Sequence, residues 1–271
     1  MSEAAAEVAE EVLVREDREG VAILTLNRPR QRNSLSEALI AALTAEMTSI
    51  ADDPSVRTVV LAANGPVFSA GHDLKELTAA RQQEDRGRAY YQDIMQRCST
   101  MMLSILKNPK PVIAKVHGTA TAAGCQLVAT CDLAIAATEA QFATPGVNIG
   151  LFCSTPMVAL SRNVSRKHAM EMLLSGDMAD ANHAAEIGLI NRAVSQESLD
   201  TEVMALATKI ASKSSMTVSI GKRAFYDQLE LGISDAYAFT SEVMVKNMLT
   251  HDAEEGVNAF IEKRDPTWKD R

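Results

Sequence analysis

The sequence predicts an α/β fold, because strand-like and helix-like segments alternate along most of its length. Short apolar runs bounded by turn residues alternate with longer amphipathic segments as far as about Val194. From Ser198 onward the apolar spacing is helical throughout. We therefore expect a loose acidic arm over residues 1–11, an α/β core over residues 12–197 and a helical subdomain over residues 198–271.

The core is expected to begin with a hairpin and an amphipathic helix. Two strand-like runs, 12–15 and 21–26, flank a charged turn. Ser36 can cap a helix whose apolar positions recur with helical spacing, and Asp52-Asp53-Pro54 ends that helix. The run TVVLA at 58–62 predicts the next strand.

The same signals predict the later elements. A helical region from 79 to 106 ends at Asn108-Pro109-Lys110-Pro111, and the apolar run VIAKV predicts a strand at 112–116. Two further short strands are expected at 133–137 and 189–194. Helices are expected at 157–162, from 165 to 175 and after Asp180, and the C-terminal helices should break near 212–215, Gly232 and His251.

Two joints between a strand and a helix are built from unusually small residues. One is the run from Gly118 to Gly124 (GTATAAG), and the other is Ser69-Ala70-Gly71-His72. Small residues allow another group to approach the backbone closely, and a helix N-terminus offers free N–H groups to negative charge. Two such N–H groups that converge would form an oxyanion hole. Joints of this kind also occur where a helix merely packs tightly on a strand.

Composition excludes several classes of function. Of 271 residues, 46% are hydrophobic, and the net charge of −8 argues against a general nucleic-acid-binding or anionic-membrane surface. No apolar run approaches the roughly 20 residues that cross a bilayer. The four cysteines form no C-x-x-C pair and have no histidine at zinc spacing, so we expect no metal site. The N-terminus is neither a secretory signal nor a transit peptide, which predicts a cytoplasmic protein.

Several motifs, in the same order, resemble the crotonase superfamily of enoyl-CoA hydratases and isomerases. FSAGHDLKEL is followed by PVIAKVHGTATAAGCQLVATCDLAIA, and the runs at 27–35 and 255–264 resemble the first and last signatures of that superfamily. The run from Thr144 to Pro156 is most similar to the enoyl-CoA hydratase domain-containing protein 3 subgroup. The resemblance implies a spiral of repeated β-β-α units with a C-terminal helical subdomain that forms homotrimers, or hexamers made of two trimers.

The resemblance also implies an acyl-CoA substrate and a set of catalytic positions. The backbone N–H groups of His72 and Ala123 would form the oxyanion hole for the thioester, with no cofactor besides the CoA moiety of the substrate. Hydratases carry two glutamates for general acid–base work, and the matching positions here are Gln126 and Gly146, which cannot exchange protons. On this basis, replacing both by glutamate is expected to raise any hydratase activity.

Three activities therefore stay open at this point. The first is that of a nominal enoyl-CoA hydratase of fatty acid metabolism. The second is another reaction of a CoA thioester such as decarboxylation, and the third is non-catalytic acyl-CoA binding. The substrate-binding residues implied by the resemblance are Arg28, Arg30, Ala70, Asp73, Leu74, Thr121, Gln126, Pro145, Gly146, Phe260 and Lys263. Of these, Arg28 or Arg30 would contact a CoA phosphate, because guanidinium groups suit phosphate oxygens, and Phe260 and Lys263 would reach the CoA of a neighbouring subunit.

Overall fold

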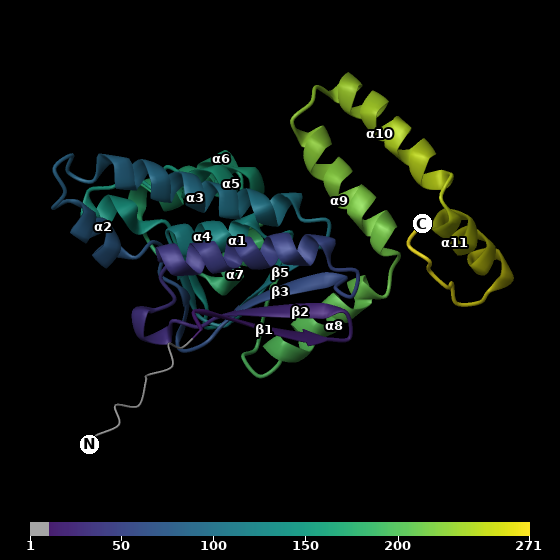
Figure 1. The fold of residues 1–271 in the computed structure, drawn as a ribbon, viewed down its shortest axis with the longest axis horizontal. Coiled ribbons are helices and arrows are strands. Elements are labelled where there is room, and N and C mark those ends of the chain that lie inside the picture. The colour runs from purple at the N-terminus through teal and green to yellow at the C-terminus, as the bar shows by residue number, and fades with distance from the viewer. Residues whose placement is uncertain (1–10) are drawn as a thin grey trace, which may run out of the picture.

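Two β-sheets of different size organise the part of the chain that the computed structural model describes, residues 11–271 (Figure 1). The larger sheet has six strands in the order β1-β2-β3-β5-β7-β10. The β1–β2 pair is an antiparallel hairpin, and the remaining neighbours are parallel. Of the predicted arm at residues 1–11, all but Glu11 lies outside the described residues.

The strands of the larger sheet confirm those expected from the sequence. They are β1 (Leu13–Arg18), β2 (Val21–Leu26), β3 (Thr58–Ala63), β5 (Val112–Val116), β7 (Leu133–Ala137) and β10 (Arg192–Val194). Only the last is clearly shorter than predicted. The central strands are buried on both faces, which explains why their sequences are continuous apolar runs.

The smaller sheet was not predicted. Its four strands follow the order β4-β6-β8-β9, and the first three are parallel. They are β4 (Val67–Ser69), β6 (Thr119–Thr121), β8 (Gln141–Ala143) and β9 (Ala179–Asp180). The run 118–124, which the sequence analysis treats as a joint between a strand and a helix, therefore contains a strand of its own. Segments of two or three residues are too short to show an alternating pattern.

The chain winds as a spiral through both sheets. β3 of the larger sheet is followed by β4 of the smaller one, and the same step is repeated from β5 to β6 and from β7 to β8. Helices follow each pair. Because β4, β6 and β8 are parallel neighbours, their C-terminal ends lie at the same edge of the smaller sheet.

Helices cover both faces of the larger sheet. On one side, α1, α3 and α4 pack with the sheets around the main core. On the other, α8 places Leu199 and Val203 against Val60 and Ile113 (Figure 1). The core helices are α1 (Glu37–Asp52), α2 (Leu74–Ala80), α3 (Arg88–Lys107), α4 (Ala123–Thr130), α5 (Pro156–Asn163), α6 (Arg166–Ser175), α7 (Ala181–Glu186) and α8 (Leu199–Ala211), with short 3-10 turns η1 (Pro29–Gln31) and η2 (Pro145–Ile149).

Helix boundaries mostly match the predictions. Ser36 caps α1, and its hydroxyl accepts a hydrogen bond from the Leu39 N–H at 3.3 Å. The region expected to be one helix from 79 to 106 is instead divided, because Gly87 has a left-handed backbone (φ +84°) and Asp85 accepts the N–H groups of Gly87 and Ala89 there.

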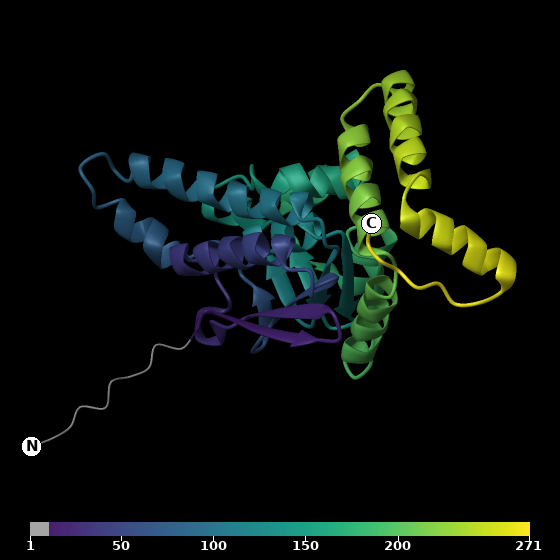
Figure 2. The same ribbon diagram turned by 45° about the vertical axis from the view of Figure 1, so that its right-hand side comes forward.

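The last three helices extend away from the core (Figures 1 and 2). They are α9 (Ser215–Leu229), α10 (Ile233–Met248) and α11 (His251–Glu262), and the breaks between them lie where predicted. α10 has no buried residue, and Tyr237, Met248 and Phe260 are among the large apolar side chains left exposed. Among the described residues, none of the helices combines the length and hydropathy that crossing a bilayer demands. The domain boundary at 197/198 stays a prediction.

Candidate functional site

The ends of three neighbouring strands carry the residues that the sequence analysis emphasised. His72 follows β4, Ala123 follows β6, and Pro145 and Gly146 follow β8. Ligands of parallel sheets bind at the C-terminal ends of the strands, where loops from adjacent strands meet. The topology therefore places three segments at one edge of the smaller sheet: the joint at 69–72, the joint at 118–124 and the segment 144–146.

The two small-residue joints are in contact. Gly71 has a φ of +87°, and a methyl group added to it would lie 2.9 Å from Ala122 Cβ and 3.1 Å from the Ala123 nitrogen. A methyl group added to Gly124 would lie 2.2 Å from the Ser69 carbonyl oxygen. Only glycine at these positions allows the chain segments to approach so closely. The small residues thus permit this contact.

The N–H groups of His72 and Ala123 are left free at this contact. The Leu35 N–H donates to the Gly71 carbonyl and the Asp73 N–H donates to the Leu35 carbonyl, so the intervening His72 N–H does not face Leu35. Ala123 is the first residue of α4 and lacks an intrahelical acceptor. No acceptor within residues 11–271 takes either N–H.

Ala122 has a strained backbone. Its φ of 50° and ψ of −120° lie in a region that L-residues rarely adopt. The Ala122 N–H donates to the Ala143 carbonyl at 2.9 Å, and its carbonyl accepts from the Gln126 N–H at 3.0 Å. Strain of this kind costs about 1–3 kcal/mol and persists where surrounding contacts fix it. Here it sets the direction in which α4 begins.

Buried polar atoms of three side chains beside the joints lack hydrogen-bond partners within the described residues. They are both ring nitrogens of His72, Oε1 of Gln126 and Oγ1 of Thr144. Burial lowers the pKa of His72, so its imidazole is neutral near pH 7. Gln126 was expected among the binding residues. Thr144 was not, although a polar residue directly after a buried strand end could have suggested it.

Gly146 is enclosed by the segment that follows it. A methyl group added at Gly146 would lie 2.9 Å from both Cys153 Sγ and the Leu151 carbonyl oxygen. The expectation that glutamates at positions 126 and 146 would raise hydratase activity stays a prediction, and a side chain at 146 would have to displace one of these two atoms. Burial also raises the pKa of the Cys153 thiol, so that thiol stays protonated near pH 7.

Gly146→Ala is expected to lower the free energy of unfolding by about 1–3 kcal/mol, the usual cost of overpacking. The added methyl group must displace either the Cys153 thiol or the Leu151 carbonyl. Urea denaturation of the variant and the parent protein measures the effect. The double variant Gly146→Ala, Cys153→Ala should recover part of the loss, and equal losses in both variants would contradict this explanation.

Two of the predicted substrate-binding residues, Arg28 and Asp73, form an ion pair with each other. The Arg28 guanidinium lies 3.1 Å from the Asp73 carboxylate, with both side chains largely buried. Burial alone raises the pKa of Asp73, but hydrogen bonds from Ser34, the Lys75 N–H and Arg28 outweigh it and hold that pKa below its usual value. Arg28 therefore positions the N-cap of α2, whereas Arg30 is exposed to solvent.

The other predicted binding residues divide into two groups. Ala70, Leu74, Thr121 and Pro145 lie within two residues of the joints or of Gly146. Phe260 and Lys263 lie on or just after α11, the yellow helix that projects from the core in Figure 2. Within one chain, the structure therefore brings the first group together and leaves the second apart from it.

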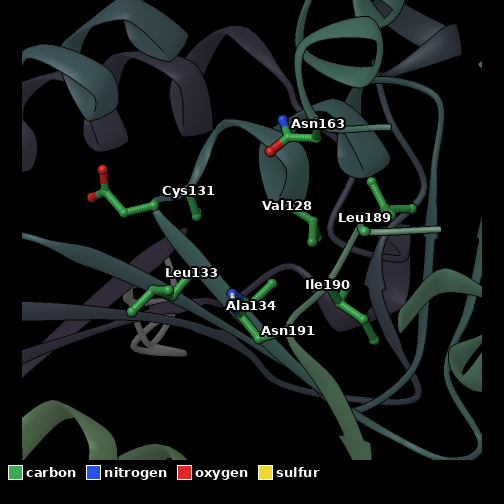
Figure 3. A pocket seen from close by; sticks show the side chains of 10 residues that line it. Val128, Cys131, Leu133, Ala134, Asn163, Leu189, Ile190 and Asn191 are labelled. Atoms are coloured by element: carbon green, nitrogen blue, oxygen red, sulfur yellow. Dashed lines mark hydrogen bonds between the residues drawn. The ribbon is translucent and has the colours of Figure 1, made fainter. Parts of the chain in front are cut away.

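A separate cavity lies at the opposite end of α4. It has a volume of about 180 Å³ and is lined by ten residues that include Asn163 and Asn191 (Figure 3). The Asn163 amide donates to the Ala129 and Ala159 carbonyls, and the Asn191 side-chain oxygen accepts from the Ala134 N–H. The side-chain amides of Asn163 and Asn191 are thus hydrogen-bonded within the protein, in contrast to the unpartnered groups beside the joints.

Comparisons with known proteins match nearly the whole chain. The family model for enoyl-CoA hydratase/isomerase matches residues 16–271. A crystal structure of an enoyl-CoA hydratase from Mycobacterium smegmatis has a TM-score of 0.91 and 52% identity, covering 96% of this chain and 99% of the other. The crystal structure of human enoyl-CoA hydratase domain-containing protein 3 has a TM-score of 0.90 and 45% identity, covering 95% and 100%.

Sequence relatives agree with these structures. The human protein named enoyl-CoA hydratase domain-containing protein 3, mitochondrial, is 47% identical over 250 residues, which are 92% of this chain and 81% of that protein. The protein named enoyl-CoA hydratase, mitochondrial, from Pongo abelii is 32% identical over 252 residues, covering 93% and 84%. The predicted resemblance to the superfamily and to the subgroup is confirmed.

The prediction of a cytoplasmic location is wrong. The rat, mouse, human, frog and zebrafish relatives are all named mitochondrial. Composition and reduced cysteines describe a folded core, whereas a cellular address is carried by a separate targeting segment. Core composition is therefore a poor guide to the compartment.

The α/β fold predicted from alternating segments is confirmed by these likenesses, which extend over both sheets and the C-terminal helices. The family model covers residues 16–271, and sequence relatives are up to 47% identical. Both account for the order of the motifs described in the sequence analysis. This chain belongs to the enoyl-CoA hydratase/isomerase family.

Proposed function

We propose that the chain binds an acyl-CoA thioester and stabilises negative charge on its carbonyl oxygen with the N–H groups of His72 and Ala123. The observation that carries this proposal is that neither group has an acceptor among residues 11–271, at a point where Gly71 lies against Ala123. Each preorganised donor in such a site is worth about 3–4 kcal/mol to an oxyanion. The N-terminus of α4 adds its dipole to the same effect.

Hydration at this site would have to proceed without the pair of glutamates that the family resemblance implies for hydratases. Gln126 and Gly146 stand where the resemblance places the glutamates of hydratases, and a side chain at 146 would have to displace Cys153 Sγ or the Leu151 carbonyl. Without a carboxylate base, an enolate is formed most readily when CO2 departs from a malonyl-type thioester. Nominal enoyl-CoA hydratase activity stays the first candidate because of the family, decarboxylation is the second, and acyl-CoA binding without turnover is the third.

We infer that the CoA moiety is held by residues around the joints and by a second copy of the chain. Arg30 is the proposed phosphate contact, because Arg28 is paired with Asp73. The exposed apolar side chains of α9–α11 suit a homotrimer or a dimer of trimers, which would bring Phe260 and Lys263 to a partner's site. No cofactor beyond CoA is needed. Light scattering tests the assembly, and the mass of a single chain would contradict it.

Binding and turnover are measured side by side. Calorimetric titration with butyryl-CoA should show binding, while hydration of crotonyl-CoA, followed by loss of its ultraviolet absorbance, should stay at the background rate. Release of CO2 from malonyl-CoA would favour the second candidate. Failure to bind any CoA thioester would overturn the proposal, and rapid hydration of crotonyl-CoA would show that carboxylates are not required here.

A further inference from the structure

The joint at 69–72 is held by a second segment, residues 32–35, which lies beside it. Hydrogen bonds of 2.8–3.2 Å connect the two at successive positions. They run from the Ala70 N–H to the Arg32 carbonyl, from the Ser69 hydroxyl to the Asn33 carbonyl, from the Leu35 N–H to the Gly71 carbonyl, from the Asp73 N–H to the Leu35 carbonyl and from the Ser34 hydroxyl to the Asp73 carboxylate. The Gly71 N–H also donates to Ser69 Oγ at 3.4 Å. The N–H groups on both sides of His72 therefore have acceptors, and these bonds fix the direction of the His72 N–H between them.

Segment 32–35 has a backbone conformation that needs support. Arg32 and Asn33 are both left-handed, with φ of 52° and 49°. Residues other than glycine rarely adopt this conformation, although asparagine tolerates it better than most. Two such residues in succession persist only where the surrounding structure fixes them.

The side chain of Asn33 supplies this support. It is fully buried, and its Nδ2 donates to the Asn64 carbonyl at 2.8 Å and to the Val67 carbonyl at 2.7 Å. Its Oδ1 accepts the Arg28 N–H at 2.8 Å. Asn64 and Val67 border the turn that leads into β4, the strand that ends at Ser69. One amide therefore connects the strained segment to the strand that carries the joint.

The second proposed donor is positioned by different contacts. Ala123 follows the strained residue Ala122 at the start of α4. The two sets of contacts meet where the Ser69 carbonyl packs against Gly124. An oxyanion hole requires both donors to lie about 2.7–3.1 Å from the same oxygen, and a misplacement of about 1 Å is costly. The direction of the His72 N–H therefore matters as much as its lack of an acceptor.

We propose that Asn33 is a positioning residue of the oxyanion hole, which fixes the direction of the His72 N–H without touching the substrate. This inference rests on the proposed function of acyl-CoA binding. The bonds of the Asn33 amide lie on the approach to the joint rather than between the apolar side chains of the main core. Loss of the amide should release segment 32–35, so that the His72 N–H loses its alignment with the Ala123 N–H.

Two ligands isolate the contribution of the thioester carbonyl in calorimetric titrations of the full-length protein. Butyryl-CoA carries the carbonyl, and S-butyl-CoA has a methylene group in its place. The parent protein should bind butyryl-CoA about tenfold more tightly, equivalent to about 1.4 kcal/mol, because two N–H groups bond to the carbonyl. Asn33→Gly, which permits the left-handed backbone but removes the amide, should reduce this ratio to about threefold, the share of the Ala123 N–H alone.

Infrared spectroscopy provides a second measurement of the same effect. Hydrogen bonds to a carbonyl lower its stretching frequency, so butyryl-CoA labelled with a heavy isotope at the carbonyl reports on the donors directly. The stretch of the bound ligand should lie at a higher frequency in Asn33→Gly than in the parent protein.

Asn108→Gly is the matched control. Asn108 is 3% exposed, and at the end of α3 its amide donates to the Met47 carbonyl at 2.8 Å and accepts the Lys110 N–H at 3.0 Å. This variant should lose stability but keep the tenfold ratio and the parent frequency. Ser69→Ala removes only the hydroxyl that bonds to the Asn33 carbonyl, and it should lower the ratio as Asn33→Gly does.

The possible outcomes separate this inference from the proposed function. A parent-like ratio in Asn33→Gly, or in Ser69→Ala if Asn33→Gly does not fold, would overturn the inference alone. An equal fall of the ratio in Asn108→Gly would do the same, because it would reflect general destabilisation. Failure of the parent protein to bind either ligand, or equal affinity for both, would overturn the proposed function.

Discussion

Gly124→Ala is expected to lower the free energy of unfolding by at least about 3 kcal/mol and to abolish acyl-CoA binding. The added methyl group would lie 2.2 Å from the Ser69 carbonyl oxygen and 2.8 Å from Ser69 Cβ. Ser69 cannot move aside easily, because it is fully buried and its hydroxyl donates to the Asn33 carbonyl at 2.9 Å. The variant must therefore separate α4 from the joint that carries His72.

The matched control is another helical glycine. A methyl group added to Gly221, inside α9, meets no atom within 4 Å. Gly221→Ala should raise the unfolding free energy by about 0.5–1 kcal/mol, because alanine favours helix. Urea denaturation and butyryl-CoA titration of both variants measure the two effects. Parent-like stability and affinity in Gly124→Ala would show that the contact between the joints is unnecessary.

The larger sheet could be predicted because its strands are long apolar runs. TVVLA and VIAKV are buried on both faces, so they stand out from the amphipathic helices on either side. The breaks between the C-terminal helices were also found, since each lies where helical spacing is interrupted. The smaller sheet could not be found in the same way. Ser69 and Thr121 end strands of only three residues, whose pairing depends on the rest of the fold.

The candidate site was predicted in part. Small residues at Gly71 and Gly124 suggested close approach, and the structure gives that contact. The enclosure of Gly146 by Leu151 and Cys153 depends on the path of a loop, which no local pattern encodes. The unpartnered hydroxyl of Thr144 likewise becomes visible only when every buried polar atom has been matched to a partner.

Asp132 illustrates how a local interpretation missed a long-range contact. In sequence it lies two residues after the end of α4, where an aspartate suggests no more than the end of a helix. In the structure its carboxylate accepts the Lys222 ammonium at 2.7 Å, the Tyr226 hydroxyl at 2.8 Å and the Val112 N–H at 2.7 Å. Lys222 and Tyr226 belong to α9, so this buried cluster attaches the C-terminal helices to the core. A partner 90 residues away cannot be inferred from spacing.

Lys222→Met is therefore expected to lower the free energy of unfolding by about 3–5 kcal/mol, the usual cost of leaving one member of a buried ion pair alone. The Lys222 side chain is 6% exposed, and its ammonium also donates to the Ile105 and Lys110 carbonyls at 3.0 Å. Burial lowers the pKa of Lys222, while Asp132 opposes that shift by stabilising the charged form. Methionine fills similar space but leaves the Asp132 carboxylate and both carbonyls with fewer partners.

Two further variants separate charge from packing in this cluster. Lys209→Met replaces an exposed lysine on α8 and should change stability by less than about 0.5 kcal/mol. Asp132→Asn combined with Lys222→Met removes the unpaired charge, so the double variant should be more stable than Lys222→Met alone. Urea denaturation of this set together with the single variant Asp132→Asn gives the coupling energy between the two residues. Additive losses would mean that the ion pair is not what holds α9 against the core, and the orientation of α9–α11 would then have to depend on the contacts of α8 and the C-terminal segment.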